Sequence, residues 1–377
     1  MRKNRTKAAV FLLAAFLTGA AAVGCAAPET ETAAQTEESS TEVPETESAE
    51  AESEASFGEV GNTTAGFTLD SVSESAILQG EIYHFSHEAS GAKLAWIANS
   101  DPELAFCIGY HTPCVDETDT NHIFEHAIIT SSEKYPGTTL FFDLMGKSYN
   151  TFVNAFTYSV FTMYPLASES EDQLLKMMDV YMSCMAAPGI LTEENLFKRE
   201  ALRYELDSPD GELVMTGTVF AEDNAYLTDV NSEANNNVLD ALFPGQYAAN
   251  SIGRMHRNYK DLTYEGAIAT YERAYHFDNS LILLYGDMDC ERVLQFLDSE
   301  YLSKAGVNGT DLSAYEDPKT EDGHVEVTVP VPAYEGDASE NASRIDYAIS
   351  MEEAAWEDLL AWQVVASVLN QENGAFY

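Results

Sequence analysis

The sequence predicts an α+β fold, in which helices pack on a mixed β-sheet and an incomplete second α+β domain follows. Short segments alternate apolar and polar residues, as half-buried strands do. Longer amphipathic segments lie between these runs, as expected for helices that cover a sheet. The two kinds of segment do not alternate strictly, which favours an α+β arrangement over a parallel α/β sheet.

The first half of the folded part is predicted to begin near residue 66 with a β-hairpin, and residues 66–73 are largely polar and give no strand signal. The predicted strands span residues 82–86, 93–99, 104–111 and, within a β-branched and aromatic run, 151–165. The predicted helices begin near 122 and span 140–145, 169–187 and 193–207. Capping residues at 116–121 precede the first of these helices, and the turn Tyr135-Pro136-Gly137 ends it.

The second half of the sequence predicts more helices and then a second set of strands followed by a helix. We expect helices at 213–242, 263–275 and 289–301 and a strand at 280–287, which completes a domain over residues 66–305. A polar linker at 306–323 leads to strands at 324–331 and 344–351 and a helix at 353–369. So few elements cannot close a core, so we expect the second domain, 324–377, to be completed by a further part of the polypeptide or by a partner chain.

The N-terminus predicts export and a lipid anchor. Four basic residues precede an apolar run at 8–23 that is short for a membrane span, and Gly24-Cys25 follows. The ending Ala22-Val23-Gly24-Cys25 resembles a bacterial lipobox, which implies a signal peptide at 1–25, lipidation of Cys25 and an extracytoplasmic location at the cell membrane. Residues 26–56 are rich in Glu and contain no basic or aromatic residue, so a disordered linker is expected over 26–62.

Charge and cysteine usage exclude several classes of function. The formal net charge of −44 argues against general binding of nucleic acid, which requires Lys and Arg on the phosphates. Either a solvated surface or the attraction of basic partners accounts for this charge. Cys107, Cys114, Cys184 and Cys290 form no C-x-x-C pair, so a cysteine zinc site is not expected, and both disulfides and free thiols remain open.

One stretch carries chemistry: HIFEH at 122–126, an H-x-x-E-H zinc-peptidase pattern. His122 and His126 lie four residues apart, so on a helix they share one face and can hold one Zn²⁺. Glu125 lies at the edge of that face and can take a proton from an attacking water. A third ligand must come from a separate element, and the helical pattern at 213–242 offers four carboxylates between which spacing cannot choose: Glu222, Asp223, Asp229 and Glu233.

Six stretches in the right order resemble one family. They are HIFEH at 122–126, SSEKYP at 131–136, NAFTYSVFTMYP at 154–165, VYMSCMAAP at 180–188, TVFAE at 218–222 and YHFDNSLILLYGD at 275–287. In these stretches the chain resembles the M16 metallopeptidases (pitrilysin/insulinase-like), in particular the presequence-protease and falcilysin branch. The resemblance extends from about residue 66 to residue 377.

The resemblance implies a set of site residues. His122, His126 and Glu222 would bind one zinc ion per chain, with Glu222 lying 96 residues after His126, and Glu125 would be the general base. Asp229 would orient a histidine ligand, although a solvated helix residue explains it equally well. Asn154, Ala155, Phe156 and Thr157 would form an edge strand that pairs with the substrate backbone. A core strand with Phe156 and Phe161 buried is the alternative.

The resemblance therefore implies a zinc-dependent endopeptidase or oligopeptidase that hydrolyses unfolded peptides outside the membrane. Two departures from the family pattern qualify it: the third ligand lies in Ala221-Glu222-Asp223-Asn224-Ala225 instead of the usual Asn-Glu-Met-Lys-Gly, and no second half follows to supply Arg and Tyr groups. The alternative function is a lipid-anchored module that keeps the zinc site and binds peptides or a partner without cleaving them.

Overall fold

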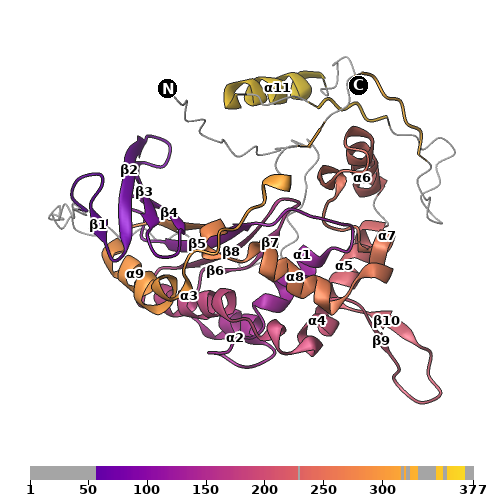
Figure 1. Ribbon diagram of the computed structural model, residues 1–377, viewed down its shortest axis with the longest axis horizontal. Helices are drawn as coiled ribbons and strands as arrows, with labels where there is room; N and C mark the ends of the chain where they lie inside the picture. The colour runs from indigo at the N-terminus through magenta and orange to yellow at the C-terminus, as the bar shows by residue number, and fades with distance from the viewer. Residues whose placement is uncertain are drawn as a thin grey trace, which may run out of the picture.

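The computed structural model describes residues 57–227, 230–315, 318–319, 323–329, 345–350 and 355–369. Within these residues the folded body is built on a nine-stranded sheet in the order β1-β2-β3-β4-β11-β5-β8-β6, with β7 paired to β8 (Figure 1). The strands are β1 (Thr63–Thr64), β2 (Phe67–Ser75), β3 (Gly80–His87), β4 (Lys93–Ala98), β5 (Leu104–His111), β6 (Phe152–Val153), β7 (Phe156–Thr157), β8 (Phe161–Ser168) and β11 (Ser280–Tyr285).

The sheet is mixed because β11 enters it between two strands from the beginning of the chain. β11 runs parallel to β4 and antiparallel to β5, with Ile282 opposite Leu94 on one side and Ile108 on the other. Every second residue of β5 is buried, as its alternating sequence predicts. The prediction of an α+β fold with helices on a mixed sheet is confirmed.

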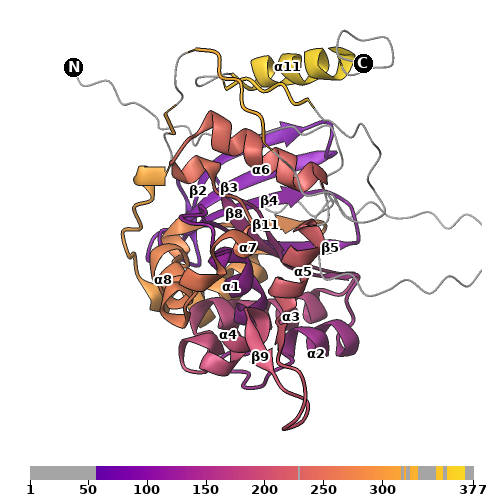
Figure 2. The same cartoon turned by 90° about the vertical axis from the view of Figure 1, so that its right-hand side faces the viewer.

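The helices are α1 (Thr120–Ile128), α2 (Leu140–Lys147), α3 (Glu171–Ala186), α4 (Glu194–Glu200), α5 (Thr218–Leu227), α6 (Val230–Leu242), α7 (Met255–Asn258), α8 (Tyr264–Ala274), α9 (Cys290–Leu297), α10 (Ser303–Ala305) and α11 (Trp356–Leu369). A π-helical turn, Asp298–Leu302, follows α9. As drawn in both views, α1 to α4 and α8 lie below the strands (Figures 1 and 2). None of the helices in the described part of the chain is long and apolar enough to cross a membrane.

Helix α1 occupies the centre of this layer, and eight of its nine residues are buried. Its apolar side chains, Ile123, Phe124, Ala127 and Ile128, enter the hydrophobic core. The Phe124 ring packs 4.9 Å from the ring of Tyr275 at the end of α8. The helix therefore buries its polar residues along with its apolar ones.

Two of the predicted helices are shorter than expected. The helix predicted at 193–207 ends with α4 and is followed by strand β9 (Arg203–Glu205), and the one predicted at 213–242 divides into β10 (Val214–Thr216), α5 and α6. β9 and β10 form an antiparallel hairpin that projects from the body (Figure 1). A Cβ at Gly217 would lie 1.9 Å from the Ala201 carbonyl oxygen, so glycine lets the two ends of the hairpin approach each other.

Other expectations are also corrected at the edges of the fold. Residues 67–75, which gave no strand signal, form β2. The ring centroids of Phe57 and Phe85 lie 5.3 Å apart, so residues 57–62 belong to the folded body and not to a disordered linker. The described residues 324–329 and 345–350 contain no strand, whereas α11 matches the predicted helix at 353–369. The signal peptide and residues 26–56 lie outside the described residues. The four cysteines that the structure describes carry free thiols.

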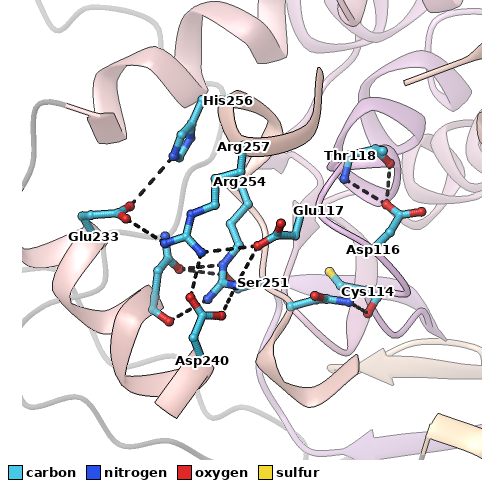
Figure 3. Close-up of polar contacts among 12 residues, drawn as sticks. Cys114, Asp116, Glu117, Thr118, Glu233, Asp240, Ser251, Arg254, His256 and Arg257 are labelled. Atoms are coloured by element: carbon cyan, nitrogen blue, oxygen red, sulfur yellow. Dashed lines mark hydrogen bonds and ion pairs between the residues drawn. The ribbon is translucent and has the colours of Figure 1, made fainter. Parts of the chain in front are cut away.

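A buried arginine fixes the loop before α1 to helices α6 and α7 (Figure 3). The Arg254 side chain is completely buried, and its guanidinium donates to Glu117 at 3.2 Å and to Asp240 at 2.8 Å. Arg257 contacts the same two carboxylates and also donates to Glu233 at 2.7 Å. Such a network holds its members in one arrangement because an unpaired charge at this depth is unfavourable.

Arg254→Ala should lower the free energy of unfolding by about 3 kcal/mol, the lower end of the range for breaking a buried ion pair, because its partner carboxylates are partly exposed. Denaturant titration measures the change. Arg292→Ala removes an exposed arginine that pairs with Glu171 and Asp172, and it should unfold close to the wild-type midpoint. Equal effects of the two substitutions would contradict this role of Arg254.

Candidate metal centre

Three polar side chains of α1 lie side by side in the protein interior. His122, Glu125 and His126 are only 2%, 3% and 8% exposed. The two imidazole rings lie on one face of the helix with their centroids 4.9 Å apart, as the i, i+4 spacing predicts. A buried helix can carry these groups only if polar partners from other elements surround them.

The first partner is Glu222 on α5. Its Oε2 atom lies 3.3 Å from Nε2 of His122 and 3.6 Å from Nε2 of His126. Among the described residues, no donor meets this buried oxygen in hydrogen-bonding geometry. Three potential ligand atoms, one from each side chain, all lie within 4.8 Å of one another.

This arrangement fits a zinc ion. Zinc takes imidazole nitrogen and carboxylate oxygen at about 2.0–2.1 Å, so the ligand atoms of a tetrahedral site are about 3.3 Å apart. The two measured separations to Glu222 Oε2, 3.3 and 3.6 Å, are close to that value. An acceptor with no donor is also what a metal ligand presents when it is described without its ion.

The structure separates the four carboxylates between which spacing could not choose. Asp223 is buried but faces Asp119 and His122, in a second group that does not include His126. Glu233 pairs with Arg257 and lies 3.9 Å from Nε2 of His256. Asp229 lies outside the described residues. Of the described candidates, only Glu222 approaches both histidines of the motif.

The charges at the site favour an ionised Glu222. Burial raises its pKa, but the contact with His122 and the charges of both imidazoles outweigh burial, and the net shift is downward. Burial lowers the pKa of His122, but the hydrogen bonds and charges of the surrounding carboxylates raise it well above its usual value. A raised pKa of His122 means that a proton and a metal ion would compete for this imidazole.

Glu125 stands beside this group without joining it. Its Oε2 atom accepts a hydrogen bond of 2.7 Å from Oγ1 of Thr157 on β7, and both side chains are buried. Burial raises the pKa of Glu125, although the neighbouring histidines and Thr157 oppose the shift. A carboxyl group with a raised pKa next to a metal site is suited to accept and return a proton.

The four residues expected to bind substrate lie in strand β7 and directly before it. Within the described residues β7 pairs only with β8, so its other edge is open next to the site. Ala155 and Thr157 are buried, Asn154 accepts a hydrogen bond on its carbonyl oxygen from Tyr181, and Phe156 is half-buried. The hydroxyl of Thr157 contacts Glu125, a contact that the sequence pattern did not indicate. Substrate pairing by this strand stays a prediction.

Two further carboxylates that sequence reasoning missed contact the outer nitrogens of the histidines. Glu200 at the end of α4 lies 3.6 Å from Nδ1 of His126, and Asp119 lies 3.2 Å from Nδ1 of His122. Burial raises the pKa of Glu200, but His126 and Arg199 outweigh it and lower the pKa to about 2. Burial and the charge of Asp119 raise the pKa of Asp223 to about 8. The sequence indicated Asp119 only as one of the helix-capping residues at 116–121.

Comparison with known proteins agrees with this site. The model of the family described as Insulinase (Peptidase family M16) matches residues 104–242, which contain both histidines, Glu125 and Glu222. Protein HypA of Clostridium perfringens is 33% identical over 241 residues, 64% of this chain. The mitochondrial presequence protease of Xenopus laevis is 30% identical over 249 residues, 65% of this chain. Over residues 104–242 the chain matches the M16 family of peptidases.

Solved structures share the fold. Pitrilysin superposes with a TM-score of 0.51 and 13% identity, over 71% of this chain and 26% of its own. A protease from Helicobacter pylori superposes with a TM-score of 0.50 and 14% identity, over 64% of this chain and 54% of its own. The chain covers only 25% of HypA and 24% of the presequence protease, so it spans about a quarter of the length of these relatives.

Proposed function

We propose that this chain carries the zinc centre of an endopeptidase or oligopeptidase that hydrolyses unfolded peptides. One observation carries the proposal: His122, His126 and Glu222 converge in a buried cluster with Glu125 beside them, in a segment that matches the M16 family. A general base adjacent to three metal-binding side chains is the arrangement that metal-assisted hydrolysis requires.

His122, His126 and Glu222 would hold one zinc ion, His122 and His126 through Nε2 and Glu222 through Oε2. When bound there, zinc would polarise the carbonyl of the scissile peptide bond and make a water molecule nucleophilic at neutral pH. Because its pKa is lowered, Glu222 would offer the cation an ionised carboxylate.

Glu125 would move the proton. It would accept a proton from the attacking water and donate it to the leaving amine, so that no covalent intermediate with the protein is needed. The hydrogen bond from Thr157 leaves Oε1 for the proton and fixes the orientation of the carboxyl group. Because burial raises the pKa of Glu125, the protonated form needed in the second step is accessible.

The open edge of β7 would bind the substrate. A peptide added antiparallel or parallel to this edge would exchange main-chain hydrogen bonds with Phe156 and neighbouring residues. Main-chain pairing demands little of the substrate sequence, which suits varied, unfolded peptides.

The difference in length between the chain and its relatives supports a second candidate function. Because the chain spans about a quarter of the relatives' length, a further part of the polypeptide or a partner chain would complete the chamber around the peptide. Alone, the chain would then be a peptide- or partner-binding module that retains the zinc site.

We further propose, from the sequence alone, that the protein is a bacterial lipoprotein held outside the cell membrane through Cys25. Expression in a bacterium with radiolabelled palmitate should label the wild-type protein in the membrane fraction. Cys25→Ser should lose both the label and the membrane association. A labelled Cys25→Ser protein would contradict the proposal, and Cys107→Ser, which alters a cysteine of the folded body, is the matched control.

The purified chain should contain close to one zinc ion, and Glu222→Gln should reduce zinc affinity by at least about 10-fold, because an amide oxygen is a neutral and weaker ligand. Metal analysis after dialysis and competition with a chromophoric chelator measure both. Glu233→Gln makes the same chemical change on α6 and should bind zinc as the wild type does. Unchanged zinc affinity in Glu222→Gln would exclude Glu222 as the third ligand.

Cleavage of a quenched fluorescent peptide should depend on zinc and should fall by about 100-fold or more in Glu125→Gln, since general acid–base catalysis contributes about 10²–10⁴-fold. This variant should still bind zinc, because Glu125 lies outside the ligand cluster. Zinc binding without cleavage by the wild-type chain would favour the binding module. Full cleavage by Glu125→Gln would exclude Glu125 as the base.

A further inference from the structure

We propose that Asp119 is a positioning residue that holds the imidazole of His122 with its proton on Nδ1 and its Nε2 lone pair directed at the metal site. The inference rests on the proposed zinc centre and adds to it a residue that lies outside the H-x-x-E-H motif. It depends on four features of Asp119: its place at the start of α1, its backbone conformation, its burial and its partners.

Asp119 is the residue at which α1 begins, yet its side chain does not cap the helix. Its carbonyl oxygen accepts the first helical hydrogen bond, from the backbone N–H of Ile123 at 3.1 Å. An aspartate at this position usually accepts a second bond from a backbone N–H of the first turn, and Asp119 makes no such bond. Its Oδ2 atom lies instead 3.2 Å from Nδ1 of His122.

The backbone of Asp119 is in the left-handed region, at φ 57° and ψ 31°. This conformation costs an L-residue about 1 kcal/mol or more, although aspartate and asparagine tolerate it better than most residues. Glycine would occupy the position without that cost. Asp119 keeps its side chain in this unfavourable backbone conformation, and the side chain contacts His122 and does not cap the helix. We infer that the contact with His122 is the reason for an aspartate at this position.

The Asp119 carboxylate is itself held in place. It is 2% exposed, and the backbone N–H of Gly253 donates to its Oδ2 at 3.2 Å. Two residues later, the backbone N–H of Met255 donates to Oδ2 of Asp223 at 2.9 Å. The turn between these two donors carries Arg254, which the buried ion-pair network fixes (Figure 3).

The backbone turn at residues 253–255 therefore holds a carboxylate on each side of the candidate metal site. Asp119 contacts the ligand His122, and Asp223 directly follows the ligand Glu222 on α5. A histidine whose outer nitrogen donates to a fixed carboxylate has one tautomer and one ring orientation, and it is a more basic ligand. His126 has a similar but longer contact, 3.6 Å from Glu200.

A second metal ion is the competing explanation, because Asp119, His122 and Asp223 also offer three atoms within 4.8 Å of one another. In that arrangement Nδ1 of His122 would have to lose its proton while Nε2 binds zinc. The 3.2 Å contact between Nδ1 and Oδ2 of Asp119 has hydrogen-bond geometry, which the contact between Nε2 and Oε2 of Glu222 lacks. The positioning role is therefore favoured.

The test compares the wild type with Asp119→Asn and Asp119→Gly. Asn keeps the shape and an acceptor but loses the charge, and Gly removes the contact while suiting the backbone conformation. Zinc affinity, measured by chelator competition, should fall by about 10–100-fold in Asp119→Gly and by less in Asp119→Asn. The unfolding midpoint of the metal-free protein separates this effect from a loss of stability, and it should change little in Asp119→Asn.

Asp116→Asn is the matched control, because Asp116 lies in the same loop and accepts from Thr118 without contacting His122. It should bind zinc as the wild type does. In the cobalt-substituted protein, the visible absorption bands should shift in both Asp119 variants and not in Asp116→Asn, since only the former alter a ligand's surroundings.

Wild-type zinc affinity in both folded Asp119 variants would overturn the inference, as would two metal ions per wild-type chain. If Asp119→Gly does not fold, the result with Asp119→Asn decides. Failure of the proposed zinc centre is a separate outcome, because it would appear as absent zinc in the wild type or as unchanged affinity in Glu222→Gln.

Discussion

The complete burial of helix α1 is the constraint on which the rest of the site depends. A helix in the core cannot leave imidazoles and a carboxyl group without partners, because each unpaired polar group there is costly. Every polar residue of the motif accordingly has a partner from another element: Glu222 on α5, Glu200 on α4 and Thr157 on β7. The packing of these three elements around one helix is thus what assembles the candidate metal centre.

Burial also sets the electrostatic character of the site. The same low-dielectric surroundings raise the pKa of Glu125 and allow the carboxylates of Glu222 and Glu200 to depend on the histidines for their charge. The two kinds of carboxyl group are chemically alike and differ in their contacts: Glu125 meets a hydroxyl, whereas the other two meet imidazoles. These contacts are consistent with the proposed roles of Glu125 as proton carrier and Glu222 as metal ligand.

Local sequence patterns predicted the parts of this structure that local physics determines. Alternation located β3 and β4, strand-forming composition indicated β5, β8 and β11, and the i, i+4 spacing placed His122 and His126 on one face. β2 was missed because its outer half is exposed on both faces, and the β9–β10 hairpin was missed because short polar strands and helix ends share the same composition. The contacts of Thr157 and Glu200 with the motif were missed because tertiary packing, and not spacing, brings these residues to α1. Asp119 lies only three residues before His122, but its place in the loop before the helix indicated a capping role instead. The resemblance to a family, and not the residue pattern, singled out Glu222.

The β9–β10 hairpin explains why sequence spacing could not identify the third ligand. Arg203 pairs with Thr216 at its base, so α4 ends and α5 begins at nearly the same place, however long the excursion between them. Glu200 and Glu222, on either side of it, therefore both reach His126 although 22 residues separate them in the chain. Residues could be inserted or removed at the hairpin tip without moving either carboxylate. The number of residues between the motif and the proposed third ligand thus depends on the length of the hairpin, whereas the position of Glu222 depends on the pairing at the base of the hairpin.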